Sequence, residues 1–178
     1  MIYHHVLETD KIKLRALEPH DIDILYDWEN DSDIWLVSST VTPFSRDILQ
    51  KYIDAAHLDI YSVKQLRLIV EVKDIAMPVG MVDLFDFDPH NKRCGIGIFI
   101  ASKYQHKGYA QESISCVKKY ARDVLFLSQL YAEISQVNLP SLHLFTKLNF
   151  VHTGTKKAWI LTPEGYIDQL FFQCLLRE

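Results

Sequence analysis

The sequence lacks the features that mark several common classes of protein. Its 178 residues include three cysteines, Cys94, Cys116 and Cys174, which are far apart and form no C-x-x-C pair. This spacing suggests neither a zinc site nor a disulfide framework. The eight histidines form no H-x-x-x-H or similar ligand pair, so we expect no metal. The formal charge of −4 provides no broad basic field that would favour nucleic acid as a partner.

Long apolar segments are also missing. No uninterrupted apolar run approaches the roughly 18 residues needed to cross a bilayer, and residues 1–11 have no apolar stretch typical of a signal peptide. We find no internal repeat, low-complexity tract or linker. We therefore expect no membrane partner, a reducing, cytoplasmic setting, and one domain spanning residues 1–178 with a substantial core.

Apolar periodicity predicts a mixed α/β protein. Helices are expected to begin near four residues that suit a helix start, Pro19, Ser45, Gly108 and Asn138. Strands are expected over residues 12–17, 66–72, 79–87, 93–101, 130–136, 151–160 and 166–176. The order is strand, two helices, three strands, helix, strand, helix and two strands. This order predicts a mixed sheet with helices packed on it.

The turn at residues 105–110, Gln-His-Lys-Gly-Tyr-Ala, is the candidate for binding chemistry. It lies between an apolar strand and an amphipathic helix. Backbone N–H groups at a helix start bind anions, and Gly108 permits close approach because it has no Cβ. Lys107 adds positive charge. A glycine-containing turn of this kind is also common as a plain connection, so the spacing alone leaves both interpretations open.

Two motifs in order resemble those of the GNAT N-acetyltransferases. They are Q-x-x-G-x-A at residues 105–110 and N-x-x-S-x-x-x-F-x-K-x-N-F at residues 138–150. Residues 14–18 and 28–31 resemble the branch that contains spermidine and ribosomal-protein N-terminal acetyltransferases. The resemblance covers nearly the whole chain. It implies one mostly antiparallel sheet of about seven strands, flanked by about four helices, with a splayed central pair of parallel strands.

The same resemblance implies acetyl-CoA as co-substrate, without a metal. The pyrophosphate would lie at the turn, and the pantetheine along the preceding strand and near the start of the helix after Asn138. Residues further along that helix would lie nearer to one end of the coenzyme, either its thiol end or its nucleotide end. The implied coenzyme-binding residues are Ile98, Phe99, Ile100, Gln105, His106, Lys107, Gly108, Tyr109, Ala110, Asn138, Ser141, Phe145 and Lys147.

Two acid–base groups usual in the family are missing. Many relatives have a tyrosine where this chain has Phe145, and several have a glutamate within the stretch that is here residues 94–97, Cys-Gly-Ile-Gly. Ser141 matches a serine used by ribosomal-protein acetyltransferases, so we predict it as proton donor to the thiolate. Ser141 and Phe145 are four apart and share a helix face. The alternative for Ser141 is a first-turn residue that binds its own backbone.

An alkyl amine with a pKa near 10.4 is protonated at neutral pH, so a base would help it attack. The candidates are Glu71, Asp83 and Glu133, and we favour Asp83 because it lies mid-strand between apolar residues. The alternative is a solvated sheet face. Asp31 and Asp33, beside Trp35, are candidates for attracting a cationic amine; the alternative is a solvated helix end.

The sequence therefore predicts an N-acetyltransferase that acts on a primary amine of a polyamine-like small molecule or on a protein N-terminus, by direct attack in a ternary complex. The alternative is an acyl-CoA-binding module with weak or no catalysis, because the usual tyrosine and glutamate are absent. A different acyl group also remains open. The last strand either fills the core, which we favour, or pairs with another subunit in a homo-oligomer.

Overall fold

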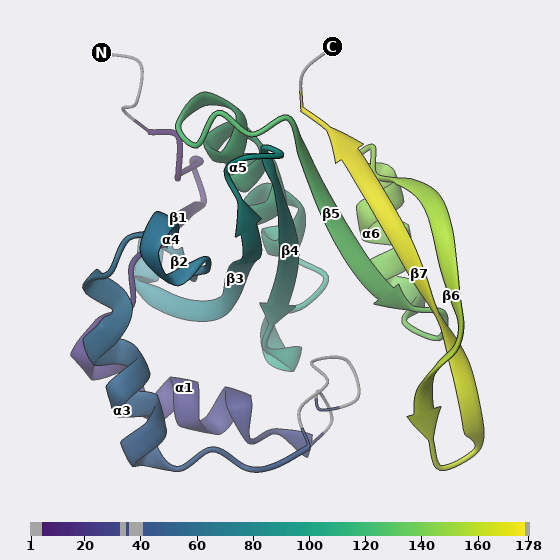
Figure 1. The fold of residues 1–178 in the computed structure, drawn as a ribbon. Coiled ribbons are helices and arrows are strands. Elements are labelled where there is room, and N and C mark those ends of the chain that lie inside the picture. The colour runs from purple at the N-terminus through teal and green to yellow at the C-terminus, as the bar shows by residue number, and fades with distance from the viewer. Residues whose placement is uncertain (1–4, 33–34, 36–40, 177–178) are drawn as a thin grey trace.

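The protein is described by a computed structural model, which covers residues 5–32, 35 and 41–176. Its centre is a seven-stranded sheet in the order β1-β2-β3-β4-β5-β7-β6 (Figure 1). β4 and β5 run parallel, and the other neighbours run antiparallel. The strands are β1 Ile12–Arg15, β2 Leu66–Val72, β3 Met77–Asp88, β4 Arg93–Ile100, β5 Gln129–Ser135, β6 Val151–Thr162 and β7 Gly165–Leu175.

The expected helices are present, with the expected caps. The Ser45 side chain accepts a hydrogen bond from the Ile48 N–H, and the Asn138 side chain accepts one from the Ser141 N–H. An additional single-turn helix, α4, escaped prediction because one turn shows no measurable periodicity. The helices of the described residues are α1 Ile22–Glu29, α3 Arg46–Asp54, α4 Ile60–Val63, α5 Tyr109–Asp123 and α6 Leu139–Lys147. None of them is long and apolar enough to cross a membrane.

Side chains alternate between the two faces of the sheet and build two cores. The larger core packs against α5 and α6 and includes Leu84, Ile96 and Leu130. The smaller core packs against α1 and α3 and includes Ile69 and Met81. Figure 1 shows α1 and α3 on one side of the sheet and α5 and α6 on the other. We call the side that carries Ile69 and Met81 the α1 face.

Most strand ends differ from the prediction by one or two residues, and β6 continues to Thr162 instead of residue 160. β1 ends at Arg15 instead of residue 17, because the chain turns toward the 3-10 helix Pro19–Asp21. β3 begins two residues earlier, at Met77, and includes Pro78. The register of β2 against β3 shifts between Val70 and Glu71, and this irregularity makes room for a proline that has no N–H to donate.

β4 and β5 pair over only three residues, Arg93 with Gln129, Cys94 with Leu130 and Gly95 with Tyr131. Each strand continues further and stays paired with its other neighbour, β3 for β4 and β7 for β5. The two strands therefore part after Gly95, and Figure 1 shows them diverging toward the level of α1. This confirms the predicted splayed parallel pair.

Candidate functional site

The turn before α5 has the geometry of an anion site. Gly108 has a φ of 86°, in the left-handed region that favours glycine, and a Cβ placed there would have no atom within 4 Å. The first main-chain bond of α5 runs from the Glu112 N–H to the Gly108 carbonyl at 3.1 Å. Helix geometry therefore leaves the N–H groups of Tyr109, Ala110 and Gln111 pointing out of the helix end. Such a cluster of donors fits a pyrophosphate.

Two lysines add positive charge to this turn. The ammonium groups of Lys103 and Lys107 lie 4.9 and 5.6 Å from the centre of the Tyr104 ring, and both residues are exposed. The Gln105 side chain donates to the Ile100 carbonyl at 3.0 Å and ties the turn to the end of β4. Sequence reasoning missed Lys103, although its K-x-x-x-K spacing with Lys107 was a usable signal.

The only carboxylate in the first turn of α5 is held away from the anion site. Glu112 accepts a hydrogen bond from the Thr9 hydroxyl at 2.5 Å and forms an ion pair with Lys11 at 3.3 Å. His106, also exposed, has a φ of 61°. Its left-handed backbone shapes the turn, whose main-chain N–H groups are the predicted anion donors.

Ile98, Phe99 and Ile100 lie on the part of β4 that has separated from β5. They pair with β3 on one side only, for example Phe99 with Met81. Main-chain groups directed toward β5 are thus available for another partner. An amide-rich chain such as pantetheine carries the donors and acceptors that such groups require, and β4 leads on toward the turn at Gly108.

The predicted residues of α6 divide into two groups. Asn138 and Ser141 begin the helix, and Asn138 Oδ1 accepts from the Ser141 N–H at 3.2 Å. The half-buried Ser141 hydroxyl has no hydrogen-bond partner among the described residues. Further along, Phe145 is only 3% exposed and packs edge-on against Phe150, whereas Lys147 is exposed. Ser141 therefore has a hydroxyl available for hydrogen bonding.

Asp83 lies on the α1 face and is opposite Gly97 of β4 in the strand register. Arg67 binds it with two hydrogen bonds, Nε to Oδ1 at 2.7 Å and Nη2 to Oδ2 at 2.8 Å, and also binds Glu29. The same guanidinium lies 5.3 Å from the centre of the Tyr52 ring. Burial alone would lower the pKa of Arg67, but the two carboxylates outweigh it and raise that pKa.

The other candidate bases are also paired but lie elsewhere. Glu71 accepts from Arg15 at 2.6 Å near the β1 edge of the sheet, and Glu133 on β5 binds Lys156 at 2.7 Å. Asp83 alone among the three is on β3, the direct neighbour of β4. Its paired oxygens keep further lone pairs for an incoming ammonium group.

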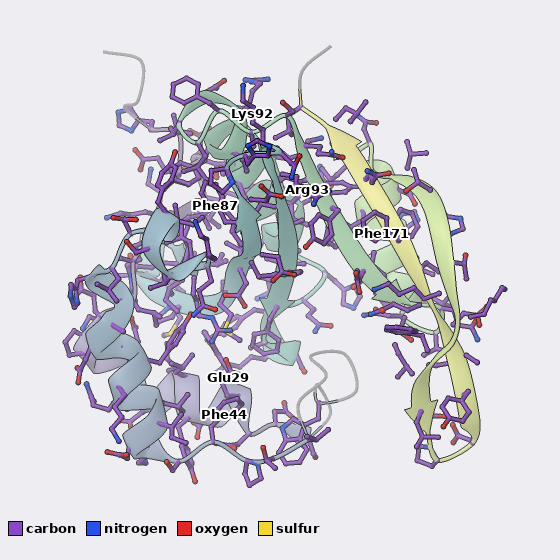
Figure 2. All side chains as sticks on the ribbon, viewed as in Figure 1. Glu29, Phe44, Phe87, Lys92, Arg93 and Phe171 are labelled. Carbon is purple, nitrogen blue, oxygen red and sulfur yellow. The ribbon has the colours of Figure 1, made fainter. Side chains whose placement is uncertain are left out.

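The predicted acceptor residues lie after α1. Asp31 is half-buried, and the Trp35 indole N–H donates to the Glu29 carbonyl at 3.1 Å. Asp33 lies outside the described residues. Since Glu29 also binds Arg67, the structure links Trp35 to the ion pair that holds Asp83. Figure 2 shows Glu29 at the end of α1, level with the lower part of the diverging strands.

An aromatic cluster of Phe85, Tyr131 and Phe171 lies where β4 and β5 part, and sequence reasoning missed it. Phe85 meets Tyr131 edge-on, with centroids 6.0 Å apart, and Tyr131 stacks on Phe171 at 5.2 Å. Figure 2 labels Phe171 on β7. The Phe85 ring covers Gly95, where a Cβ would lie 2.2 Å from the Phe85 Cε2 atom. The ring thus occupies the space that a side chain at residue 95 would need.

The Tyr131 hydroxyl is held in this cluster by a carboxylate. It donates to Asp86 Oδ2 at 3.1 Å. Burial, together with the charge of Asp86, raises the pKa of Tyr131 above its ordinary value. The phenol therefore stays protonated at neutral pH and remains a hydrogen-bond donor.

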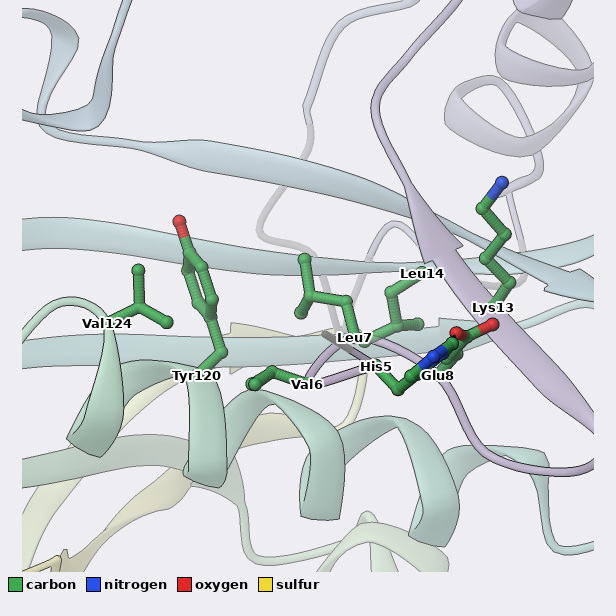
Figure 3. A pocket seen from close by; sticks show the side chains of 8 residues that line it. All are labelled: His5, Val6, Leu7, Glu8, Lys13, Leu14, Tyr120 and Val124. Atoms are coloured by element: carbon green, nitrogen blue, oxygen red, sulfur yellow. The ribbon is translucent and has the colours of Figure 1, made fainter. Parts of the chain in front are cut away.

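A separate hollow of about 390 Å³ lies between the N-terminal segment, β1 and α5 (Figure 3). It is lined by eight residues, among them Leu7, Tyr120 and Val124, and by none of the predicted site residues. Tyr120 is twelve residues beyond Gly108, which corresponds to about 18 Å along a helix. This hollow is therefore distinct from the candidate site at the other end of α5.

Comparison with known proteins agrees with this geometry. Residues 11–151 match the family model described as an acetyltransferase (GNAT) domain. The chain is 26% identical over 177 residues to the uncharacterized N-acetyltransferase p20 of Bacillus licheniformis, covering 97% of each.

Two solved structures share the fold. A spermidine N-acetyltransferase from Vibrio cholerae, in complex with CoA and spermine, superposes with a TM-score of 0.85 at 23% identity, covering 94% of this chain and 97% of that one. A dodecameric structure of the Vibrio cholerae spermidine N-acetyltransferase gives a TM-score of 0.77 at 22% identity, with 94% and 95% covered. With the family match spanning most of the sequence, the chain belongs to the GNAT acetyltransferase family.

Proposed function

We propose that the protein transfers an acetyl group from acetyl-CoA to a primary amine of a small, polyamine-like molecule or of a protein N-terminus, in a ternary complex. The observation that carries this proposal is the continuity of two features. The gap between β4 and β5 opens after Gly95, and β4 then leads directly to the open helix start at Gly108. A long thioester with a pyrophosphate end fits such a path.

The coenzyme would be held by three segments. Main-chain groups of residues 98–100 would bind the pantetheine, and those of residues 105–110 the pyrophosphate, with Lys107 and Lys103 neutralising charge. Asn138 and Ser141 would lie beside the pantetheine. Phe145 would contribute packing from the core, and Lys147 a charge at the far end of α6.

When bound, acetyl-CoA supplies the thioester whose C–S bond breaks as the amine nitrogen forms its bond to the acetyl carbon. Asp83 would accept the proton of the ammonium group at a carboxylate oxygen, while Arg67 keeps that carboxylate in place. The Ser141 hydroxyl would donate a proton to the departing sulfur and regain one from the amine nitrogen, which loses its second proton as the amide forms. A main-chain N–H near Phe99 or Ile100 would stabilise the carbonyl oxygen. Asp31, Asp33 and Trp35 would help to attract the amine.

The second candidate function is an acyl-CoA-binding module with little catalysis. It is favoured by the phenyl ring of Phe145, which cannot donate a proton, and by the Phe85 ring, which excludes a side chain at Gly95. An assay of thiol release over a panel of amines, run beside calorimetric titration of CoA, separates the two. Tight CoA binding without thiol release for any amine would favour the module. Absence of CoA binding would refute both.

We also propose a homo-oligomer in the cytoplasm. Near the turn that joins them, β6 and β7 expose three large apolar side chains, Trp159 at 60%, Leu161 at 66% and Tyr166 at 66%, and Figure 1 shows this hairpin extending beyond the other strands. Apolar groups gathered at such a place favour contact with another protein surface. The three free thiols are buried, which suits a reducing compartment.

A further inference from the structure

Two groups of aromatic side chains flank one glycine on the α1 face. Trp28 of α1 packs against Phe99 of β4, with ring centroids 5.5 Å apart. The cluster of Phe85, Tyr131 and Phe171 covers Gly95, four residues earlier on β4. Four residues of strand span about 13 Å, and Gly97 lies midway. The aromatic groups therefore stand on both sides of Gly97.

Gly97 itself leaves an opening between these groups. It is half-exposed, and a Cβ at this position would have one neighbour within 4 Å, the Phe85 Cε1 atom at 3.9 Å. Asp83 is its direct partner across the β3–β4 pair, where Cβ positions of partners are about 5 Å apart. A carboxylate thus borders an otherwise aromatic opening, next to the point where β4 and β5 part.

Two further carboxylates on this side of the sheet, Glu29 and Glu133, are bound to basic side chains, whereas Asp86 accepts a hydrogen bond from the Tyr131 hydroxyl. Arg67 binds Glu29 as well as Asp83, and Lys156 binds Glu133. The Arg67 and Glu29 side chains are only 16% and 10% exposed. A second positive charge of an acceptor that approached Glu29 or Glu133 would meet the positive charge of Arg67 or Lys156 already bound there, and this repulsion opposes its binding.

We infer, resting on the proposed acetyl transfer but departing from the polyamine-like acceptor named with it, that the preferred acceptor is a monoamine that carries an aromatic ring or a similarly flat apolar group. Its ammonium group lies at Asp83 above Gly97. Its flat group lies against the cluster of Phe85, Tyr131 and Phe171. Offset and edge-on ring contacts make this arrangement favourable, and the ammonium group is also attracted to the ring faces.

The test compares 2-phenylethylamine and tryptamine with spermidine and n-propylamine, each as acceptor for acetyl-CoA. We expect kcat/KM for the two aromatic amines to exceed that for spermidine about tenfold or more, which corresponds to the strength of a few ring contacts. In parallel, calorimetric titration of each amine into the CoA-loaded protein measures binding without turnover, and we expect the same order.

Phe171→Leu supplies the matched variant, since it keeps an apolar side chain but removes the stacking partner of Tyr131. We expect KM for 2-phenylethylamine to rise about fivefold and KM for n-propylamine to stay unchanged. Phe126→Leu is the control, because this exposed phenylalanine lies in the connection between α5 and β5. It should leave both KM values as in the parent protein.

The outcomes separate this inference from the function on which it rests. Thiol release that is fastest with spermidine, or amine affinities in that order, would overturn the inference and leave acetyl transfer intact. An equal rise of KM for both monoamines in Phe171→Leu would also overturn it. Thiol release with none of the amines would refute the proposed function, and the binding order would then decide whether the opening selects aromatic amines.

Discussion

Replacing Gly95 with alanine should destabilise the protein through one contact. The added Cβ would lie 2.2 Å from Cε2 of Phe85 and 2.6 Å from Cδ2 and Cζ. Ordinary carbon–carbon contacts are about 3.5–4 Å, so the ring has to move by roughly 1.5 Å. Overpacking of this kind costs about 1–3 kcal/mol, and the loss of a strand glycine returns about 0.5–1 kcal/mol. We therefore expect the free energy of unfolding of Gly95→Ala to fall by about 1–2 kcal/mol.

Urea unfolding measures this loss. With a slope of about 2 kcal/mol per molar urea, the midpoint of Gly95→Ala should fall by about 0.5–1 M at an unchanged slope. Gly97→Ala is the matched control, because its Cβ meets only one atom, at 3.9 Å. The double variant Phe85→Leu with Gly95→Ala should have a free energy of unfolding about 1 kcal/mol higher than the sum of the two single changes predicts, because the smaller side chain removes the clash. Equal midpoints for the two alanine variants, or strict additivity of the double variant, would refute the reasoning.

Four further variants test the site and the scaffold. Gly108→Asp should weaken CoA binding at least about tenfold by calorimetry, since a carboxylate would face the anion site; unchanged affinity would contradict the placement of the pyrophosphate. Ser141→Ala should lower kcat about tenfold or more with the CoA affinity preserved, and an unchanged kcat would remove Ser141 as proton donor. Trp159→Ser should lower the mass measured by light scattering if the hairpin joins subunits; the parent mass would argue against that interface. Burial would raise the pKa of Asp21, but the hydrogen bonds from Arg15 and from the Glu18 N–H, together with the charge of Arg15, outweigh burial and lower that pKa. The stabilisation is therefore present above the unfolded pKa of about 3.9 and is lost as pH falls through the lower folded value. Asp21→Asn should therefore cost about 3 kcal/mol at pH 7, and this difference should shrink below about pH 4; a constant difference would contradict the linkage.

The sequence was most informative where the signal is local. Helix starts at Ser45 and Asn138 follow from side chains that accept hydrogen bonds from N–H groups three residues away, and the turn at Gly108 follows from a backbone shape that glycine favours. Apolar alternation predicted the strands within a few residues. The splayed pair came from the resemblance to a family, because periodicity does not report which strands separate.

Contacts between residues far apart in the sequence could not be predicted from local sequence patterns. Arg67 and Glu29 are 38 residues apart in sequence and meet only because α1 packs on the sheet. Phe171 reaches Tyr131 because β7 lies between β5 and β6, an order that strand patterns leave undetermined. The position of Phe85 over Gly95 depends on the register between β3 and β4, which local patterns do not report.

The short pairing of β4 with β5 also has a mechanical consequence. In the described part of the chain, three register pairs at one end are the only strand pairing between the halves β1–β4 and β5–β7–β6. A ligand that hydrogen-bonds to both β4 and β5 would act as an additional, non-peptide strand. It would stiffen the sheet where these two strands are not paired with each other. Amide hydrogens of Ile98 and Ile100, which alternate along β4 with the groups paired to β3, should then exchange slowly only when CoA is bound. The coenzyme would thus also complete the sheet against which the acceptor lies.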